Sequence, residues 1–453
     1  MTSTSIPATA TRPRSAWSGA AIRSSSTWPE AVDLSPPRGT LDFLPPDGDR
    51  MLALYDRAAG LARSYGYRYV ETPGFERTEL FSLTSGQTSD IVTKEMYTFK
   101  DRGRRSLTLR PEGTAPVMRA YLNRLSGGPS AFKAYYLTRM YRYGRPQAGR
   151  YREHRQFGIE VFGVAGATAD VETIAVGDRF LRSLGLSRYH IELNSIGDEV
   201  CRPAYRAELI DYLQANRERL RDEHRDRIEE NPLRVLYCKD EACRAIAAEA
   251  PKIVDRLCGP CREHFDAVQE GLEDQDIKAT LTPTLVRGLD YYTRTAYEFV
   301  SEVLSQAQAT LFGGGRYDRL AEALGGPRVP GVGFGMGLER VLLALKDEGV
   351  EPPSEPAPDA FVVGIGEVGG KRARDVARAL REAGLAVDRS FEDRPLGAQL
   401  RMADRSEARY AVIVGEREAA AGTVTVRRLA DGWQETLPLD LAIERIARGG
   451  EPG

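Results

Sequence analysis

The sequence predicts an α+β protein in which helices flank an antiparallel sheet, with a helical insertion and a separate C-terminal α/β domain. Three observations lead to this fold class. Short strand-like runs separated by glycine- and arginine-rich turns fill residues 91–163, which is the pattern of an antiparallel sheet. Residues 199–272 change to an arginine- and glutamate-rich helical periodicity, and residues 347–359 form a proline- and glutamate-rich linker that divides the chain.

Composition places the chain among ordinary folded proteins. Its 453 residues allow roughly three domains of about 150 residues each. Hydrophobic residues make up 42% of the chain and charged residues 28%, which excludes the collagen-like and wholly disordered classes. The net charge of -2 gives no overall attraction to a polyanion, so any nucleic-acid binding needs a local site. No apolar run reaches the ~18 residues of a membrane span, so we expect a cytoplasmic protein without membrane attachment.

The first 34 residues are expected to form a disordered tail. Residues 1–29 contain no Asp or Glu but twelve Ser or Thr, and they follow neither a helical nor a strand period. The alternative is an organellar transit peptide, which has the same arginine- and serine-rich, acid-poor composition.

Residues 35–346 are predicted to form one domain that contains the sheet and the insertion. Apolar residues at helical spacing predict a first helix over Gly48–Gly66, and a strand-like run predicts a strand over Tyr67–Val70. The sheet then takes strands at Met96–Phe99, Ser106–Leu109, Lys133–Met140 and Gln156–Phe162, with one helix at Ala115–Leu125. After the insertion we expect strands at Leu281–Leu285, Thr295–Val300 and Val332–Phe334, and a helix at Leu338–Leu345.

Strand and helix alternate beyond the linker, which predicts a compact α/β domain over residues 360–449. Its expected segments are strands at Phe361–Gly364, Ala411–Val414 and Thr423–Leu429 and helices at Lys371–Ala383 and Leu396–Ala408.

Four of the five cysteines cluster within the insertion. The spacing Cys238-x4-Cys243-x14-Cys258-x2-Cys261 suits a structural zinc site with four thiolate ligands. Two alternatives stay open, namely reduced thiols buried among helices and a redox dithiol at Cys258-Gly-Pro-Cys261, which lacks the preceding strand of the thioredoxin-like fold. A catalytic zinc is disfavoured because four cysteine ligands leave no open position.

An arginine-rich segment with interleaved aromatic residues is the clearest sign of a ligand site. Residues 139–157 carry six arginines, four aromatic residues and a single acid, Glu153. Guanidinium groups suit bidentate phosphate contacts and aromatic rings stack on bases, although composition alone also fits a solvated charged loop. Two further stretches favour a binding site: Arg110-Pro-Glu-Gly-Thr114, and Gly333-Phe-Gly-Met-Gly-Leu-Glu-Arg340, whose glycines let a ligand approach the backbone. The sequence has no Walker A loop, His-Glu-x-x-His pair or Gly-x-Ser-x-Gly elbow, which disfavours P-loop and common hydrolase chemistry.

Taken in order with two more segments, Arg287–Phe299 and the expected glycine hinge in Gly313–Asp318, these stretches resemble the histidyl-tRNA synthetase family of class II aminoacyl-tRNA synthetases. The resemblance covers roughly Pro36–Arg448. The two added segments resemble the histidine-specific signatures of the family. The other similar segments are Tyr67–Phe81 with Pro73 for the first class motif, Arg139–Glu160 for the second, Gly333–Leu343 for the third, and Leu396–Glu407 and Tyr410–Gly415 for the anticodon-binding domain.

The resemblance implies a histidine–tRNA ligase, which activates L-histidine with ATP to histidyl-adenylate and transfers it to the 3′ end of tRNA(His), releasing AMP and diphosphate. It also implies a homodimer formed through the first motif, Mg²⁺ on the triphosphate, a catalytic domain at residues 35–346 and an anticodon-binding domain at residues 360–449. Because the displacement places negative charge on phosphate oxygens, positioned cations matter more than a general base.

The family's residue roles transfer onto matching positions of this sequence. The resemblance implies Arg287, Arg142 and Arg340 as the catalytic cations, with Arg142, Arg150 and Arg340 on ATP. It implies Glu112, Thr114 and Gln156 for the ammonium group of histidine, and Glu160 with Tyr291 or Tyr292 for the imidazole. Arg145 and Gln147 are the candidates for the acceptor end of the tRNA.

One position departs from the family pattern. The family usually has an acid two residues after Arg142 to accept from the adenine amino group, and here that residue is Gly144. The rival interpretation is a regulatory subunit that resembles this family and activates ATP phosphoribosyltransferase. That class lacks the C-terminal domain and degrades the Arg287 signature, and this sequence has both.

Overall fold

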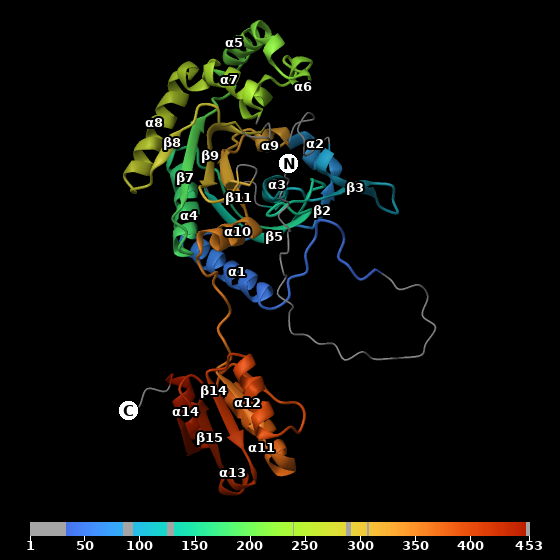
Figure 1. Ribbon diagram of the computed structural model, residues 1–453. Helices are drawn as coiled ribbons and strands as arrows, with labels where there is room; N and C mark the ends of the chain where they lie inside the picture. Colours follow the sequence, from blue (N-terminus) through green and yellow to red (C-terminus); the bar gives the residue numbers. More distant parts are fainter. Residues whose placement is uncertain are drawn as a thin grey trace, which may run out of the picture. The chain divides into compact units, whose positions relative to one another are not determined.

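The computed structural model describes residues 33–84, 94–124, 131–238, 240–286, 291–305 and 308–449 (Figure 1). The expected tail therefore lies outside the described residues except for its last two, and so does Arg287. Among the helices of the described ranges, none combines the length and apolar character that crossing a bilayer requires.

A mixed, largely antiparallel sheet organises the part of the chain before the linker (Figure 1). Within the described residues it has eight strands in the order β1-β5-β6-β11-β10-β9-β7-β8, and only the β1/β5 and β7/β8 pairs are parallel. This confirms the predicted antiparallel sheet. The strands are β1 (Arg68–Tyr69), β5 (Phe132–Tyr141), β6 (Glu153–Phe162), β7 (Tyr189–Ser195), β8 (Ala279–Leu281), β9 (Thr293–Ser301), β10 (Thr310–Arg316) and β11 (Gly331–Gly337).

Helices cover both faces of this sheet, as predicted. One face packs against α1 (Asp47–Ser64), α4 (Thr168–Ser183) and α10 (Leu338–Glu348) in the largest hydrophobic core. The other face packs against α3 (Thr114–Arg124) and α9 (Leu320–Ala323). Side chains alternate between the faces, so Phe157 and Ile159 of β6 enter the large core while Gln156 and Glu160 turn toward α3. The alternation is what places polar residues of β6 together on one face.

A second, small sheet adjoins α2 (Thr78–Thr84) and α3. Among the described residues it has the order β2-β4-β3, with β2 (Phe75–Arg77), β3 (Tyr97–Lys100) and β4 (Ser106–Leu109) all antiparallel. The strand predicted at Ser106–Leu109 is confirmed with the same bounds. The expectation that it and Met96–Phe99 share one sheet with Lys133–Met140 and Gln156–Phe162 is wrong, because β4 pairs with β2 and β3 in this separate sheet.

Two local expectations are wrong. The strand expected at Leu281–Leu285 is β8, which ends at Leu281, because the chain turns at Pro283 and the Leu285 N–H donates to the Thr282 carbonyl. The glycine hinge expected at Gly313–Gly315 is instead the middle of β10, paired on both sides with β9 and β11. A Cβ at Gly314 would lie 2.4 Å from the Gly333 carbonyl oxygen, so tight packing between strands explains the glycine.

The insertion between β7 and β8 is helical, as predicted, and has a hydrophobic core of its own. It begins after β7 at Gly197 and returns to the sheet through its last and longest helix (Figure 1). Its α-helices are α5 (Arg202–Ala215), α6 (Asp222–Arg225), α7 (Glu241–Glu249) and α8 (Gly259–Glu273), joined by short 3-10 turns.

The C-terminal part is an α/β unit, as predicted. Its described residues form a five-stranded sheet in the order β13-β12-β14-β15-β16, parallel across β13, β12 and β14 and antiparallel beyond. The strands are β12 (Ala360–Gly364), β13 (Val387–Arg389), β14 (Tyr410–Val414), β15 (Thr423–Arg428) and β16 (Gln434–Pro438). The helices are α11 (Gly366–Glu382), α12 (Leu396–Arg405), α13 (Glu416–Ala421) and α14 (Leu439–Ala447).

Candidate active site

A polar cavity of about 370 Å³ lies over β6, β10 and β11. The arginines predicted to bind ATP, Arg142, Arg150 and Arg340, all line it. They come from the loop between β5 and β6 and from the first turn of α10, which are far apart in the sequence. The structure thus brings together cations that the sequence presents as separate motifs.

Glycines at alternate positions of β11 leave space above the strand at the bottom of the cavity. Successive odd-numbered residues of the strand point to the same face, and Gly333, Gly335 and Gly337 therefore leave that face without side chains. A Cβ at Gly335 would lie 2.5 Å from the Gln156 amide nitrogen, and one at Gly333 would lie 2.3 Å from Glu160 Oε2. The space above the strand is consequently available to a ligand and to the polar side chains of β6.

Backbone carbonyl groups hold two of the three guanidinium groups in place. The Arg142 Nε donates to the Pro111 carbonyl at 2.7 Å, and the Arg340 Nε donates to the Gly149 carbonyl at 3.1 Å. Burial lowers the pKa of Arg142 and of Arg340, and for Arg340 the positive charges of Arg142 and Arg150 lower the pKa further. The cavity is therefore a site of concentrated positive charge, which suits a polyanionic ligand.

His154, which the sequence analysis did not single out, also lines this cavity. Burial, and then the charges of Arg142, Arg340 and Arg150, lower its pKa to about 3, so the imidazole is neutral at neutral pH. Its place within the arginine-rich segment 139–157 is the one sequence signal that could have indicated that His154 lines the cavity.

A second group of polar side chains lies beside the cavity and is buried. Glu160 is 0% exposed and accepts hydrogen bonds from Thr114 Oγ1 at 2.8 Å and from the Tyr317 hydroxyl. The Tyr136 hydroxyl lies 3.4 Å from both Glu160 Oε1 and Gln156 Oε1, and Gln156 itself lines the cavity. Gln156 thereby joins the arginine cavity to the buried carboxylate.

Burial sets the ionisation of Glu160. It raises the pKa of this carboxyl to about 8, although the hydrogen bonds from Tyr317, Thr114 and Tyr136 act in the opposite direction. A buried carboxyl with a pKa of about 8, surrounded by hydroxyl groups, can accept a hydrogen bond from a ligand when it is ionised and donate one when it is protonated.

Glu112 lies at the start of α3, against the same group. Its carboxylate accepts from the backbone N–H groups of Thr114 at 2.7 Å and Ala115 at 3.1 Å. The positive end of the helix and these two donors stabilise the carboxylate, while burial raises its pKa. The sequence Pro-Glu-Gly-Thr thus positions both Glu112 and Thr114 through the first turn of one helix.

Three tyrosines whose rings contact one another at tilted or edge-on angles lie near Glu160. The rings of Tyr291 and Tyr292 lie 4.7 Å apart between centroids, and Tyr291 lies 5.5 Å from Tyr317. All three side chains are buried, and burial raises the pKa of Tyr291 and Tyr317 well above the ordinary value, so both hydroxyl groups stay protonated. Tyr136 and Tyr317 were not among the predicted site residues, although Tyr317 falls within the quoted glycine-rich segment.

The loop between β5 and β6 carries the remaining predicted residues. Arg150 pairs with Glu95, and its guanidinium group covers Gly144, where an added Cβ would lie 3.0 Å from Arg150 Nε. Arg145 and Gln147 are both exposed on this loop. Their predicted contact with tRNA therefore remains sterically accessible.

The single zinc site predicted from four cysteines is wrong. The structure separates them into two groups, Cys238 and Cys243 with His224, and Cys258 and Cys261 with Asp198 and Cys201. Cys243 is 0% exposed and belongs to the hydrophobic core of the insertion, so it packs as an apolar residue away from the other pair. Spacing along the chain could not reveal this separation, nor the participation of Asp198 and Cys201.

Comparison with known families agrees with the geometry. The pattern of the family described as histidyl-tRNA synthetase matches residues 39–341, and that of an anticodon binding domain matches residues 359–448. The chain belongs to the histidyl-tRNA synthetase family. It is accordingly an aminoacyl-tRNA synthetase, a ligase that acts on histidine and tRNA.

Several relatives extend over almost the whole chain. The histidine–tRNA ligase of Moorella thermoacetica is 49% identical over 92% of this chain and 99% of its own. That of Saccharopolyspora erythraea is 44% identical over 92% of this chain and 99% of its own. The crystal structure of apo histidyl-tRNA synthetase from S. aureus is 34% identical, with a TM-score of 0.77, over 91% of this chain and 99% of that one. These matches confirm the predicted family and fold class.

Proposed function

We propose that the arginine cavity binds the triphosphate of ATP and that the buried pocket beside it binds histidine. The convergence of Arg142, Arg150 and Arg340 on one glycine-floored cavity carries this proposal. ATP is the polyanion that a ligase of this family uses, and guanidinium groups suit the geometry of phosphate oxygens. Gln156 borders both sites, so histidine in the pocket would present its carboxylate toward the α-phosphate.

The chemical step needs positioning more than proton transfer. The histidine carboxylate is ionised at neutral pH and attacks the α-phosphorus in line with the departing diphosphate. A carboxylate oxygen–phosphorus bond forms while the bond to the β-phosphate oxygen breaks, and the diphosphate leaves with the bonding electrons. Arg142 and Arg340 stabilise the charge that develops on the phosphate oxygens. By resemblance to the family, Arg287, which lies outside the described residues, would be the third cation that stabilises charge on the α-phosphate.

The histidine pocket offers a partner for each polar group of the amino acid. Glu112, Thr114 and Gln156 would hold the ammonium group, because Glu112 and Gln156 present acceptor oxygens and Gln156 lines the cavity. Glu160 would accept from one imidazole nitrogen, and a hydroxyl of Tyr291 or Tyr292 would serve the other. A side chain lacking either nitrogen would leave a buried polar group unpaired, which gives strong discrimination.

The cavity contains carboxylate groups, which are the kind of ligand that Mg²⁺ prefers. Glu298 and Glu339 both contribute to the lining, but Glu339 accepts from the backbone N–H of Arg155 at 2.8 Å and from its guanidinium group. Glu298 likewise accepts from the Thr310 hydroxyl at 3.0 Å, so either carboxylate would hold Mg²⁺, which would neutralise charge on the triphosphate.

The remaining parts of the proposal concern assembly and tRNA. Exposed aromatic residues on β1 and β2, Tyr69 and Phe75, are each 51% exposed, which supports a homodimer formed through Tyr67–Phe81. We divide the chain into a catalytic domain at residues 35–346 and an anticodon-binding domain at 360–449 that together bind tRNA(His), in the cytoplasm. The C-terminal match over 359–448 opposes the regulatory-subunit alternative.

Exchange of labelled diphosphate into ATP, measured with each of the twenty amino acids, tests this function. Histidine alone should support exchange. Arg340→Gln should lower the rate by about two to three orders of magnitude, the usual loss for one preorganised electrostatic contact. Arg139→Gln is the matched control, because Arg139 lies on the same arginine-rich segment but is half-exposed and pairs with Glu153. Equal rates for the two variants would contradict the assignment of the cavity to ATP.

A further inference from the structure

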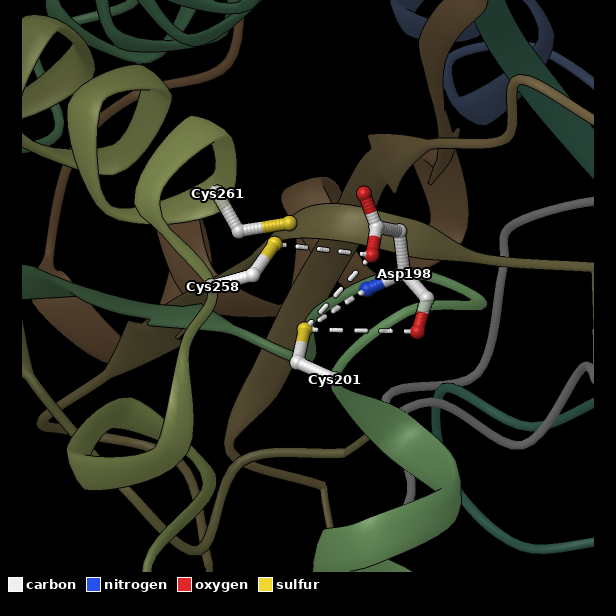
Figure 2. A group of neighbouring side chains, drawn as sticks. All are labelled: Asp198, Cys201, Cys258 and Cys261. Atoms are coloured by element: carbon white, nitrogen blue, oxygen red, sulfur yellow. Dashed lines mark hydrogen bonds between the residues drawn. The ribbon is translucent and has the colours of Figure 1, made fainter.

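Three cysteines and one aspartate converge where the helical insertion joins the sheet. Figure 2 shows the sulfur atoms of Cys201, Cys258 and Cys261 directed toward the carboxylate of Asp198. The four ligand atoms all lie within 4.8 Å of one another. Asp198 Oδ1 lies 3.6 Å from the Cys201 sulfur and 3.8 Å from the Cys258 sulfur. In a tetrahedral zinc site with Zn–S of about 2.3 Å and Zn–O of about 2.0 Å, such pairs lie about 3.5 Å apart.

The local backbone places two of the sulfur atoms at the starts of helices. Cys201 is the N-cap of α5 and Cys258 is the N-cap of α8, so the positive ends of two helices face the sulfur atoms. The backbone N–H of Asp198 donates to the Cys201 sulfur at 3.3 Å. Asp198, Cys201 and Cys261 are buried and Cys258 is half-buried, which leaves one side through which an ion can enter.

Two neighbours fit a liganding role for Asp198. Its second oxygen, Oδ2, lies 3.5 Å from the Arg294 guanidinium, so one oxygen faces the sulfur atoms while the other faces a cation. Gly197, next to it, has φ +64°, and a Cβ there would lie 2.6 Å from the Cys201 sulfur. The turn that brings Asp198 and Cys201 together therefore requires glycine for its conformation and for its space.

We infer that Asp198, Cys201, Cys258 and Cys261 form a structural site for one zinc ion. Three soft thiolates and one carboxylate provide four ligands, which fill the tetrahedral shell of zinc and leave no position for substrate. The other group, His224 with Cys238 and Cys243, offers three ligands in the described residues and is integrated into the core of the insertion. The ion would clamp the start of the insertion to the start of its last helix, because residues 198–201 begin the insertion and residues 258–261 begin α8.

The clamp would also support the histidine pocket. The Arg294 N–H donates to the Gly197 carbonyl at 2.7 Å, and the Arg202 guanidinium donates to the Tyr292 carbonyl at 3.0 Å. Tyr292 belongs to the pocket, and both contacts start from residues next to zinc ligands. This consequence rests on the proposed function, whereas the zinc site itself does not.

Zinc content measured on variants of the full chain tests the site. The chain should be expressed with added zinc, purified without chelator and analysed by elemental mass spectrometry. We expect about one zinc per chain in the wild type, less than a tenth of that in Cys201→Ala, and the wild-type content in Cys238→Ala. Cys238→Ala is the matched control, since it removes a thiol of the insertion that lies outside the proposed site.

Cobalt substitution keeps the test valid where Cys201→Ala fails to fold. Cobalt bound to the wild-type chain and to Cys238→Ala should give the same sulfur-to-cobalt absorption, because all three thiolates remain. Asp198→Asn should bind cobalt with the same band but release zinc to a colorimetric chelator at least tenfold faster. A zinc-free wild type whose five thiols all react with a thiol reagent would overturn the inference. So would zinc that persists in a folded Cys201→Ala chain, or cobalt absorption that disappears in Cys238→Ala.

Reduced affinity for histidine after zinc removal would extend the inference to the pocket. Zinc can be displaced from the wild type with a mercurial reagent and restored by adding thiol and zinc. The KM values for histidine and for ATP are then compared between the zinc-bound, zinc-free and restored protein. A rise of at least threefold in the KM for histidine, with the KM for ATP unchanged, is expected. Equal KM values before and after removal would refute the supporting role while leaving the measured zinc content as it stands.

Discussion

The buried carboxyl of Glu160 should make histidine activation depend on pH near neutrality. Its pKa is raised to about 8 by burial, so the free enzyme at pH 7 holds mostly the protonated acid. The proposed role of Glu160 is to accept a hydrogen bond from the imidazole N–H, and the ionised form accepts more strongly. The kcat/KM for histidine should therefore follow the ionised fraction and rise with pH.

The size of the effect follows from this pKa. A carboxyl with a pKa of about 8 is ionised in about one molecule in eleven at pH 7 and in about one molecule in two at pH 8. The kcat/KM for histidine should then rise about fivefold from pH 7 to pH 8 and about twofold more by pH 9. Glu160→Gln should lose this rise and should lower the plateau by about 10- to 100-fold, since a hydrogen bond to a charged group is lost.

Diphosphate exchange at saturating Mg-ATP, with histidine varied at each pH, measures the effect directly. Glu160→Gln is the matched control, because ionisation of histidine itself affects both proteins equally. Tyr317→Phe adds a second test, since the Tyr317 hydroxyl lowers the pKa of Glu160, and its removal should move the rise to higher pH. Identical pH profiles for the wild type and Glu160→Gln would refute the reasoning.

Three further outcomes are expected. Arg287→Ala should reduce histidine-dependent diphosphate exchange by about two to three orders of magnitude with unchanged circular dichroism, and a full-rate variant would remove its catalytic assignment. Gly335→Ala should displace Gln156, whose amide nitrogen lies 2.5 Å from the new Cβ, and raise the KM for histidine about tenfold, so an unchanged KM would exclude the ammonium role of Gln156. A chain ending at Asp359 should keep histidine adenylation but lose most aminoacylation through a higher KM for tRNA, and charging equal to that of the full chain would contradict the anticodon-binding role of residues 360–449.

Local patterns in the sequence were sufficient for most of the sheet. The strand predicted at Gln156–Phe162 lies within β6, because apolar and polar residues alternate there with the period that a strand imposes. The same alternation places Gln156 and Glu160 on one face of β6, whereas their assignment to histidine followed from the family resemblance. β10 was missed because its three consecutive glycines indicate a turn locally, and only close packing between three strands makes them part of a sheet.

Long-range convergence could not be predicted in the same way. The three cysteines beside Asp198 include Cys201, which lies far from the cysteine cluster in the sequence and joins it only when α5 and α8 begin side by side. Tyr136 and Tyr317 likewise reach Glu160 from β5 and from the residue after β10. Tyr136 has no sequence neighbour that distinguishes it from an ordinary core residue, whereas Tyr317 lies in the Gly313–Asp318 segment that the sequence analysis quoted without giving this tyrosine a role.

From composition alone, the arginine-rich segment could be either a phosphate-binding site or a solvated charged loop. The electrostatics of the structure favours the binding site. A solvated loop would let its guanidinium groups spread apart in water. Here backbone carbonyl groups hold Arg142 and Arg340 in place beside one cavity, and burial lowers the pKa of both. The positive potential also acts on His154, whose pKa is lowered to about 3 by burial and by the charges of Arg142, Arg340 and Arg150. The repulsion among Arg142, Arg150 and Arg340 is unfavourable in the free enzyme and is relieved when an anion binds. The arrangement of these three arginines is therefore suited to a multiply charged ligand before that ligand binds.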